Sequence, residues 1–188
     1  MSQGPARGTR KRALRYITDS IKTTIESIDC EMTDELVDAL VSADRVFLYG
    51  AGRSGFVARC FTMRLGHLGR AVVRLSIDET SPPGARDLAI IISGTGETHS
   101  SLLYGRVAKD AGARVAVITE AGSSSLARMA DITIVLTAPV GADRSRYAPM
   151  GTIFEDTALI YLDTLVVDLM ERLGETEDTM RKRHGQLY

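Results

Sequence analysis

The sequence predicts an α/β fold, a doubly wound sheet of five parallel strands with extra helices at both ends of the chain. Five short runs of β-branched and aliphatic residues alternate with segments of helical periodicity. Glycine-rich loops follow two of these runs directly, as is typical where a parallel strand passes into a helix. The chain of 188 residues is expected to form one domain, residues 1–188.

The expected elements follow one another with short connections. Residues 1–9 are expected to form a disordered tail and residues 10–43 two helices, the second capped by Thr33. The sheet core and the C-terminal helices occupy residues 45–188. The expected strands are residues 45–49, 71–75, 88–93, 114–119 and 132–136. The expected helices of this part are residues 57–68, 98–111, 123–130, 151–173 and 175–184, with a loop at 138–150.

Composition and charge exclude several classes of function. A net charge of -1 gives no overall attraction to nucleic acid or to an acidic membrane, and an aromatic content of 5% argues against base-stacking platforms. No apolar run has transmembrane length and the N-terminus has no signal-peptide core, so a cytoplasmic location is expected. Cys30 and Cys60 lie in helical patterns without metal spacing and are expected to be reduced core thiols.

The long helix expected at 151–173 has more apolar positions than one buried face requires. Contact with another subunit would explain the excess, and burial between the sheet and the N-terminal helices is the alternative. The apolar positions are Leu159, Ile160, Leu162, Leu165, Val166 and Val167.

The stretch from Leu88 to Thr98 predicts an anion site. A buried strand ends at Ser93, and the loop 93–98, which we call the anion loop, interleaves three hydroxyl side chains with two glycines before a helix begins. Free backbone N–H groups at the positive end of a helix bind anions, and phosphate is the commonest of these. A plain helix cap by Thr98 needs one hydroxyl, so the pattern favours the anion site.

The loop Gly50–Gly55 matches the dinucleotide fingerprint G-x-G-x-x-G between a strand and a helix. Asp78 and Glu79, near the end of the next strand, are the candidates for the acidic residue that binds the ribose. Two features nevertheless favour a small phosphorylated ligand: the hydroxyl of Ser54 in the turn and the richer anion loop on another strand. Because both loops follow strand carboxyl ends, we expect them to share one crevice.

Glu155 lies about one turn into the long helix and has two possible roles. It is spaced to form a capping box with Thr152, and it is also placed to act as a catalytic base near a helix N-terminus. The sequence leaves these alternatives open. Three histidines are present, His67, His99 and His184; no pair has zinc spacing, so no metal is expected.

Taken together, the two glycine loops on strands of a five-stranded sheet resemble the sugar isomerase (SIS) domain. Further stretches resemble one branch of that family, the 6-phospho-3-hexuloisomerases, over roughly residues 35–188. These stretches are Arg64–Gly69, Asp78–Thr80, Pro149–Glu155 and Lys182–His184.

The resemblance implies a flavodoxin-like SIS fold and an isomerase that interconverts 3-hexulose 6-phosphate and fructose 6-phosphate in the ribulose monophosphate pathway. It implies a homotetramer without cofactor, a cis-enediolate intermediate and Glu155 as the carboxylate base. It also places His67 and His184 near the site, with His184 reaching a neighbouring subunit. The substrate-binding candidates are Gly52, Arg53, Ser54, Ser93, Gly94, Thr95 and Thr98.

The sequence departs from the family pattern in two loops. The loop Asp78–Asp87 is shorter than expected, and the loop Thr119–Ser125 lacks the usual prolines. The identity of the sugar is therefore less secure than the type of reaction. An isomerase of another sugar phosphate is one alternative, and a non-catalytic regulator that binds phosphosugars is another. Near-neutral charge and the absence of a helix-turn-helix pattern weigh against the regulator, and no nucleic acid or membrane partner is expected.

Overall fold

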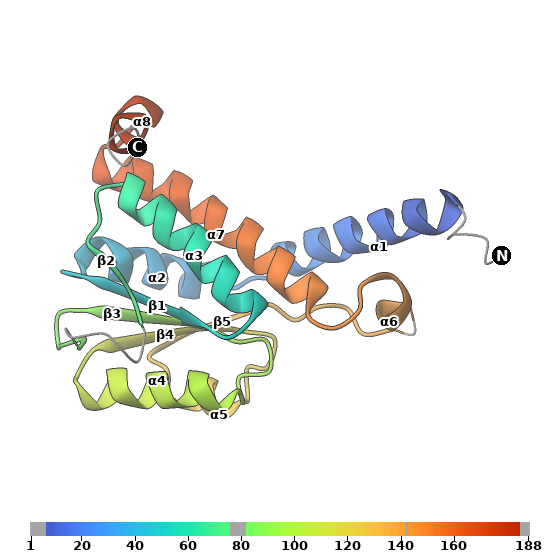
Figure 1. Ribbon diagram of the computed structural model, residues 1–188, viewed down its shortest axis with the longest axis horizontal. Coiled ribbons are helices and arrows are strands. Elements are labelled where there is room, and N and C mark those ends of the chain that lie inside the picture. Colours follow the sequence, from blue (N-terminus) through green and yellow to red (C-terminus); the bar gives the residue numbers. More distant parts are fainter. Residues whose placement is uncertain (1–6, 76–81, 142, 185–188) are drawn as a thin grey trace.

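The centre of the molecule is a sheet of five parallel strands in the order β2-β1-β3-β4-β5 (Figure 1). The computed structural model describes residues 7–75, 82–141 and 143–184. The strands are β1 (Val46–Gly50), β2 (Val72–Arg74), β3 (Leu88–Ile92), β4 (Arg114–Thr119) and β5 (Ile132–Val135). The predicted fold class is confirmed, and the strand order places a topological switch point between β1 and β3.

The central strand β3 is buried on both faces because helices cover both sides of the sheet. All five of its side chains, Leu88–Ile92, are at most 1% exposed. Such continuous apolar runs are typical of parallel strands, which cannot turn one face to water. Leu88 pairs in register with Val46 of β1 and with Arg114 of β4, so the three strands end close to the same edge.

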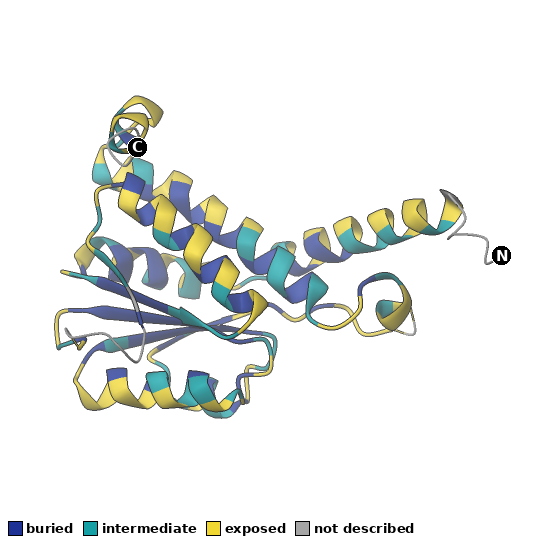
Figure 2. Ribbon diagram, in the orientation of Figure 1, coloured by how far each residue is buried: buried dark blue, intermediate teal, exposed yellow. Residues whose placement is uncertain are grey.

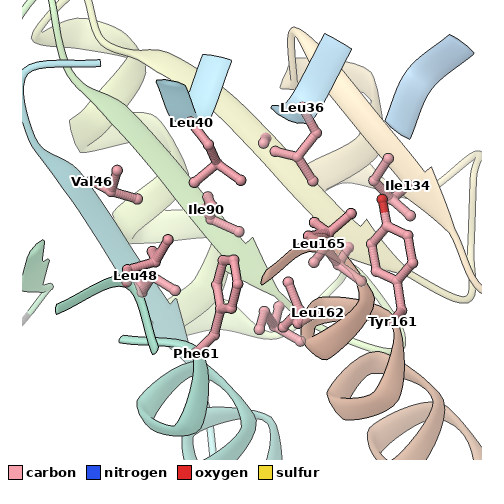
Figure 3. Close-up of a cluster of buried hydrophobic side chains, with 14 of the residues drawn as sticks. Leu36, Leu40, Val46, Leu48, Phe61, Ile90, Ile134, Tyr161, Leu162 and Leu165 are labelled. Carbon is pink, nitrogen blue, oxygen red and sulfur yellow. The ribbon is translucent and has the colours of Figure 1, made fainter. Parts of the chain in front are cut away.

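Two layers of helices enclose the sheet (Figures 1 and 2). One face packs against α2 (Cys30–Ser42), α3 (Arg53–His67) and α7 (Thr152–Leu173), and the other against α4 (His99–Asp110) and α5 (Ser125–Met129). The larger core lies between the first three helices and the sheet, and Figure 3 shows part of it. The labelled residues are Leu36, Leu40, Val46, Leu48, Phe61, Ile90, Ile134, Tyr161, Leu162 and Leu165.

Three further helices lie outside this sandwich. The N-terminal helix α1 (Arg7–Glu26) extends away from the sheet and packs against α7 and the short helix α6 (Arg144–Tyr147). Its buried Ile21 meets Ile153 of α7 in a small separate cluster. The last helix, α8 (Glu177–His184), packs on α3 and contributes Met180 to the main core.

Several expectations about the helices are wrong in detail. Helix α1 already includes residues 7–9, which were expected to be part of a tail. Asp29, not Thr33, caps α2: its carboxylate accepts from the amides of Glu31 and Met32. The helix begins at Cys30, four residues before the start that a cap at Thr33 implies.

The expectations for the loop at 138–150 and for the cysteines also need correction. The loop contains the single turn of α6, whose residues carry no apolar periodicity. Cys30 and Cys60 are both free and exposed, not core thiols. Cys60 lies on the outer side of α3, because Val57, Phe61 and Leu65 form the buried stripe of that helix.

The glycines of the first loop are explained by close packing of α3 on β1. A Cβ atom on Gly55 would lie 2.5 Å from the carbonyl oxygen of Gly50, and one on Gly50 would lie 2.6 Å from the carbonyl oxygen of Ser54. Both contacts are with backbone, which cannot move aside as a flexible side chain can. The fingerprint therefore has a structural cause, and the acid candidates Asp78 and Glu79 lie outside the described residues.

We expect Gly55→Ala to destabilise the protein by about 1–3 kcal/mol, the usual cost of overpacking. Gly66→Ala is the matched control on the same helix, because a Cβ there would meet nothing within 4 Å. That substitution is expected to stabilise the helix by about 0.5–1 kcal/mol. Urea unfolding of both variants measures the difference, and equal midpoints would contradict the packing argument.

Candidate active site

A pocket of about 330 Å³ opens at the carboxyl edge of the sheet, at the switch point between β1 and β3. We call it the carboxyl-edge pocket. Both loops contribute to it, as the sequence predicted, and so does the start of α7. Its lining residues are Ala51, Ser54, Ile92, Ser93, Gly94, Thr95, Thr98, Glu120, Met150, Gly151, Phe154 and Glu155.

Three helices begin at this pocket, and none of them has a side-chain cap. The N-cap residues of α3, α4 and α7 are Gly52, Thr98 and Gly151, and none makes a side-chain hydrogen bond to the first turn of its helix. By contrast, Asp29 caps α2 and Ser124 caps α5. Uncapped N-termini present free N–H groups and the positive end of the helix dipole, so the pocket suits an anion.

The anion loop keeps its hydroxyl groups on the pocket side. The Oγ of Ser93 donates to Oγ1 of Thr98 over 3.4 Å, and Thr98 makes no side-chain cap to α4, so the alternative of a plain helix cap is not observed. The carboxylate of Glu97, the acidic residue of this loop, instead accepts from the Ser125 amide at 2.7 Å. That hydrogen bond lowers the pKa of Glu97, whose carboxylate therefore lies against the start of α5.

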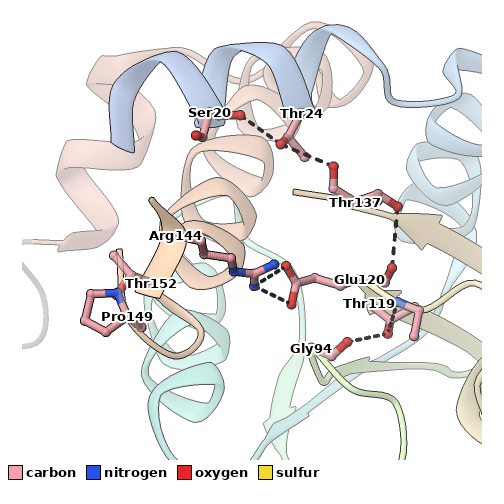
Figure 4. Close-up of polar contacts among 10 residues, drawn as sticks. Ser20, Thr24, Gly94, Thr119, Glu120, Thr137, Arg144, Pro149 and Thr152 are labelled. Carbon is pink, nitrogen blue, oxygen red and sulfur yellow. Dashed lines mark hydrogen bonds and ion pairs between the residues drawn. The ribbon is translucent and has the colours of Figure 1, made fainter. Parts of the chain in front are cut away.

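Hydrogen bonds from β4 hold the anion loop in place. The carbonyl oxygen of Gly94 accepts from Thr119 Oγ1 and from the Glu120 amide, each at 3.0 Å (Figure 4). On its other side Gly94 lies against Phe154, since a Cβ at this position would be 3.1 Å from the ring. The loop is therefore fixed between β4 and α7.

Glu155 is the fourth residue of α7, and its side chain is only 14% exposed. Its Oε2 accepts a hydrogen bond from Nε of Arg53, which raises the pKa of that guanidinium. The capping-box alternative is not observed, because Thr152 Oγ1 donates to the carbonyl oxygen of Pro149 at 2.7 Å. Burial raises the pKa of the adjacent Asp156, which lies 3.8 Å from Arg53.

Two predicted binding residues lie beside the pocket and not in its lining. Gly52 borders a separate hollow with Tyr49, Phe56 and Tyr104. Arg53 is 63% exposed and reaches the pocket through its hydrogen bond with Glu155. The remaining predicted binding residues, Ser54, Ser93, Gly94, Thr95 and Thr98, line the pocket together with Glu155.

His67 and His184 lie at the other end of α3. His67 is 13 residues beyond Ser54 on one helix, which corresponds to about 20 Å. Its Nε2 is 3.1 Å from Nδ1 of His184, and the two rings meet edge to face. Burial, then the charges of His184 and Arg64, lower the pKa of His67. The two histidines line a groove of about 530 Å³ between α3, α7 and α8. Within one chain they therefore do not share a pocket with Glu155.

Sequence reasoning missed Glu120 and its partner Arg144. Nη2 of Arg144 lies 2.8 and 3.1 Å from the two carboxylate oxygens of Glu120 (Figure 4). One signal for Glu120 was available: it directly follows the strand predicted at 114–119, at the sheet edge where ligands bind. No local signal marks Arg144, which lies 24 residues further on in a segment expected to be loop.

Comparison with known proteins places the fold and the pocket in context. A family model described as the SIS domain matches residues 39–162. The chain belongs to the SIS domain family. It is 41% identical over 157 residues to a 3-hexulose-6-phosphate isomerase of Methanocaldococcus jannaschii, covering 82% of this chain and 83% of that protein. It is 35% identical over 175 residues to a Bacillus subtilis protein of the same name, covering 91% and 95%.

A solved structure supports the same relationship. The chain superposes on a hypothetical protein of Methanococcus jannaschii with a TM-score of 0.82. The two are 34% identical, and the match covers 92% of this chain and 97% of the other. That crystal structure was reported to infer a molecular function of 3-hexulose-6-phosphate isomerase. Among the described residues of this SIS domain, no helix has the length and apolarity needed to cross a membrane.

Proposed function

We propose that this SIS domain interconverts 3-hexulose 6-phosphate and fructose 6-phosphate. The observation that carries the proposal is the position of Glu155, a largely buried carboxylate in the same pocket as the anion loop. Proton transfer between C2 and C3 requires a base in the pocket, whereas a regulator that only binds a phosphosugar requires none. The names of the relatives supply the substrate, which the pocket alone does not specify.

The phosphate group binds at the anion loop in this proposal. The hydroxyls of Ser54, Ser93, Thr95 and Thr98 and the uncapped amides of α4 donate to its oxygens. Binding at this non-reacting end holds the sugar carbons at a fixed distance from Glu155. Positioning of this kind is where binding energy assists the chemical step.

Glu155 then acts as the base for both proton transfers. It takes the proton from C2 of 3-hexulose 6-phosphate, which leaves a 2,3-enediolate with its charge on O3. The hydroxyl proton then moves from O2 to the adjacent O3, and Glu155 returns its proton to C3, which gives the C2 ketone and C3 hydroxyl of fructose 6-phosphate. A single carboxylate can serve both carbons from one face of a cis-enediolate. Arg53 occupies only Oε2, so Oε1 is left for the proton, and the guanidinium lies close enough to stabilise the developing oxyanion.

The histidine pair is proposed to serve the pocket of a neighbouring subunit. His67 and His184 are too far from Glu155 to act in their own chain. The outer faces of α3 and α7 support subunit contact, because large apolar side chains are exposed there: Phe56, Met63, Ile160 and Val167. The apolar excess of α7 is otherwise explained by burial, since Leu162, Leu165 and Val166 belong to the core.

Within this proposal the assembly is a homotetramer. Fructose 6-phosphate must open its ring before it reacts, and a histidine from the neighbouring subunit would assist that step. The proposed setting is the cytoplasm and the ribulose monophosphate pathway.

We expect Glu155→Gln to lower kcat by about 10²–10⁴-fold, the usual contribution of a general base, while phosphosugar binding is retained. A coupled assay that detects fructose 6-phosphate measures the rate. Asp168→Asn, an exposed carboxylate on the same helix, is the matched control and is expected to keep wild-type turnover. Wild-type turnover in Glu155→Gln would remove this residue from the role of base.

The double variant Ser93→Ala with Thr98→Ala is expected to raise KM by about tenfold or more, because it removes hydroxyl donors to a charged phosphate. The effect on kcat should be smaller, since these side chains bind the non-reacting end. Ser100→Ala, on the first turn of α4 but outside the pocket lining, controls for changes to that helix. An unchanged KM in the double variant would refute the phosphate assignment.

Mixed oligomers test whether the histidines act across subunits. When the assay starts from fructose 6-phosphate, whose ring must open, chains carrying Glu155→Gln and chains carrying His67→Asn are each expected to be nearly inactive alone. Oligomers assembled from equal amounts of both should regain about a quarter of wild-type activity, because random pairing joins an intact Glu155 with an intact His67 that often. No recovery would show that both residues act within one chain, and full activity of His67→Asn alone would exclude the histidine.

A further inference from the structure

The pair Glu120–Arg144 lies at the carboxyl-edge pocket but takes no part in the reaction proposed above. Glu120 lines the pocket, and its side chain is 23% exposed; that of Arg144 is 26% exposed. The pair is therefore partly shielded from water, which makes its charges more effective than those of a surface ion pair.

The position of Glu120 is fixed relative to the anion loop. Its amide donates to the carbonyl oxygen of Gly94 at 3.0 Å, and its own carbonyl oxygen accepts from Thr137 Oγ1 at 3.4 Å (Figure 4). A side chain on backbone held from both sides is suited to recognition, because little reorganisation accompanies binding. Glu120 thus has a defined distance to the site proposed for the phosphate.

Arg144 is also held from behind, through α6. The ring of Tyr147 lies against Tyr16 of α1, with ring centres 6.0 Å apart, and its hydroxyl accepts from Nε of Arg12 at 3.2 Å. Arg144 reaches Glu120 from this anchored turn. A single nitrogen, Nη2, contacts both carboxylate oxygens, so lone pairs of Glu120 are left for other donors.

The charges of the pocket decide what Glu120 can bind. Among the described residues that line it there are two carboxylates, Glu120 and Glu155, and no lysine, arginine or histidine. A carboxylate repels a phosphate dianion and accepts hydrogen bonds from hydroxyl groups. A ligand that carries its phosphate at the anion loop must therefore turn its hydroxyl-bearing part toward Glu120.

We propose that Glu120 is a specificity-determining residue, which accepts hydrogen bonds from non-reacting hydroxyl groups of the bound sugar while Arg144 holds its carboxylate in position. The proposal rests on the function proposed above. It separates the roles of the two carboxylates: Glu155 moves the proton and Glu120 selects the hydroxyl pattern. Each has its own arginine, Arg53 for Glu155 and Arg144 for Glu120.

The test compares a ligand with hydroxyl groups and a ligand without them. In Glu120→Gln, which keeps the size of the side chain, the dissociation constant of fructose 6-phosphate, measured by calorimetry, should rise about tenfold, as should KM. The inhibition constant of inorganic phosphate should stay the same or fall, because a negative charge has been removed, and kcat should stay within about threefold. Asp44→Asn is the matched control, a carboxylate paired with Arg86 far from the pocket.

Arg144 variants test the positioning role. Arg144→Met is expected to reproduce the rise in KM and also to weaken the binding of inorganic phosphate, because it leaves the charge of Glu120 unneutralised. Arg144→Lys, which keeps a cation beside Glu120, should restore part of both. The double variant Glu120→Gln with Arg144→Met removes both charges and should bind inorganic phosphate as wild type does. Weaker phosphate binding in the double variant would overturn the proposal, because it would make Arg144 a phosphate ligand.

Two further outcomes would overturn it. Unchanged binding of fructose 6-phosphate in Glu120→Gln would show that the ion pair only holds α6 in place. Equal losses for fructose 6-phosphate and inorganic phosphate in the same variant would show a general distortion of the pocket. The calorimetric comparison does not depend on turnover. A wild-type protein that binds fructose 6-phosphate but does not isomerise it would refute the proposed function. The role of Glu120 in binding could still be measured in that case.

Discussion

The parallel direction of the strands is the constraint on which the candidate site depends. Because all five strands end at one edge, the helices that follow β1 and β3 must begin there, and α7 begins beside them. Their N-termini converge on one pocket without side-chain caps. The unpaired amides and aligned dipoles of the backbone supply positive potential at a place where the lining side chains supply only carboxylates. The sheet topology itself thus creates the attraction for an anion.

The two arginines make this arrangement compatible with catalysis. A pocket with two unpaired carboxylates would repel a phosphorylated ligand, and each carboxylate would also favour the protonated form of the other. Arg53 and Arg144 each neutralise one carboxylate from outside the lining of the pocket. The anion loop therefore needs no lysine or arginine of its own. The positive charge in the site lies instead on Arg53, beside Glu155, and on Arg144, beside Glu120.

The features that depend on a local sequence pattern could be predicted from the sequence alone. The five strands, the anion loop and the position of Glu155 follow from apolar runs and from glycines and hydroxyls at strand ends, and all are found where the chain predicted them. The start of α2 was placed too late, because Asp29 and Thr33 are both of residue types that cap helices and the sequence does not choose between them. The ion pairs Arg53–Glu155 and Arg144–Glu120 join residues 102 and 24 positions apart, and their formation depends on how the loops fold. The sequence did not show that Cys60 is exposed, because several apolar residues of α3 could have formed its buried face. In the structure that face is formed by Val57, Phe61 and Leu65.

Helix α3 is held in place at both ends. Its first turn is locked to β1 by the contact of Gly50 with Gly55, and its last residue, His67, is held against α8, where Arg183 donates to the His67 carbonyl oxygen at 2.8 Å. The helix is therefore a rigid spacer. Adding one residue would move His67 by about 1.5 Å and turn it by about 100° relative to Ser54. In the proposed assembly the histidines act on a neighbouring pocket, and the number of residues in α3 would then determine how the subunits must be arranged. Insertions and deletions in this helix would then be incompatible with assembly and chemistry together, even where the fold of the single chain tolerates them.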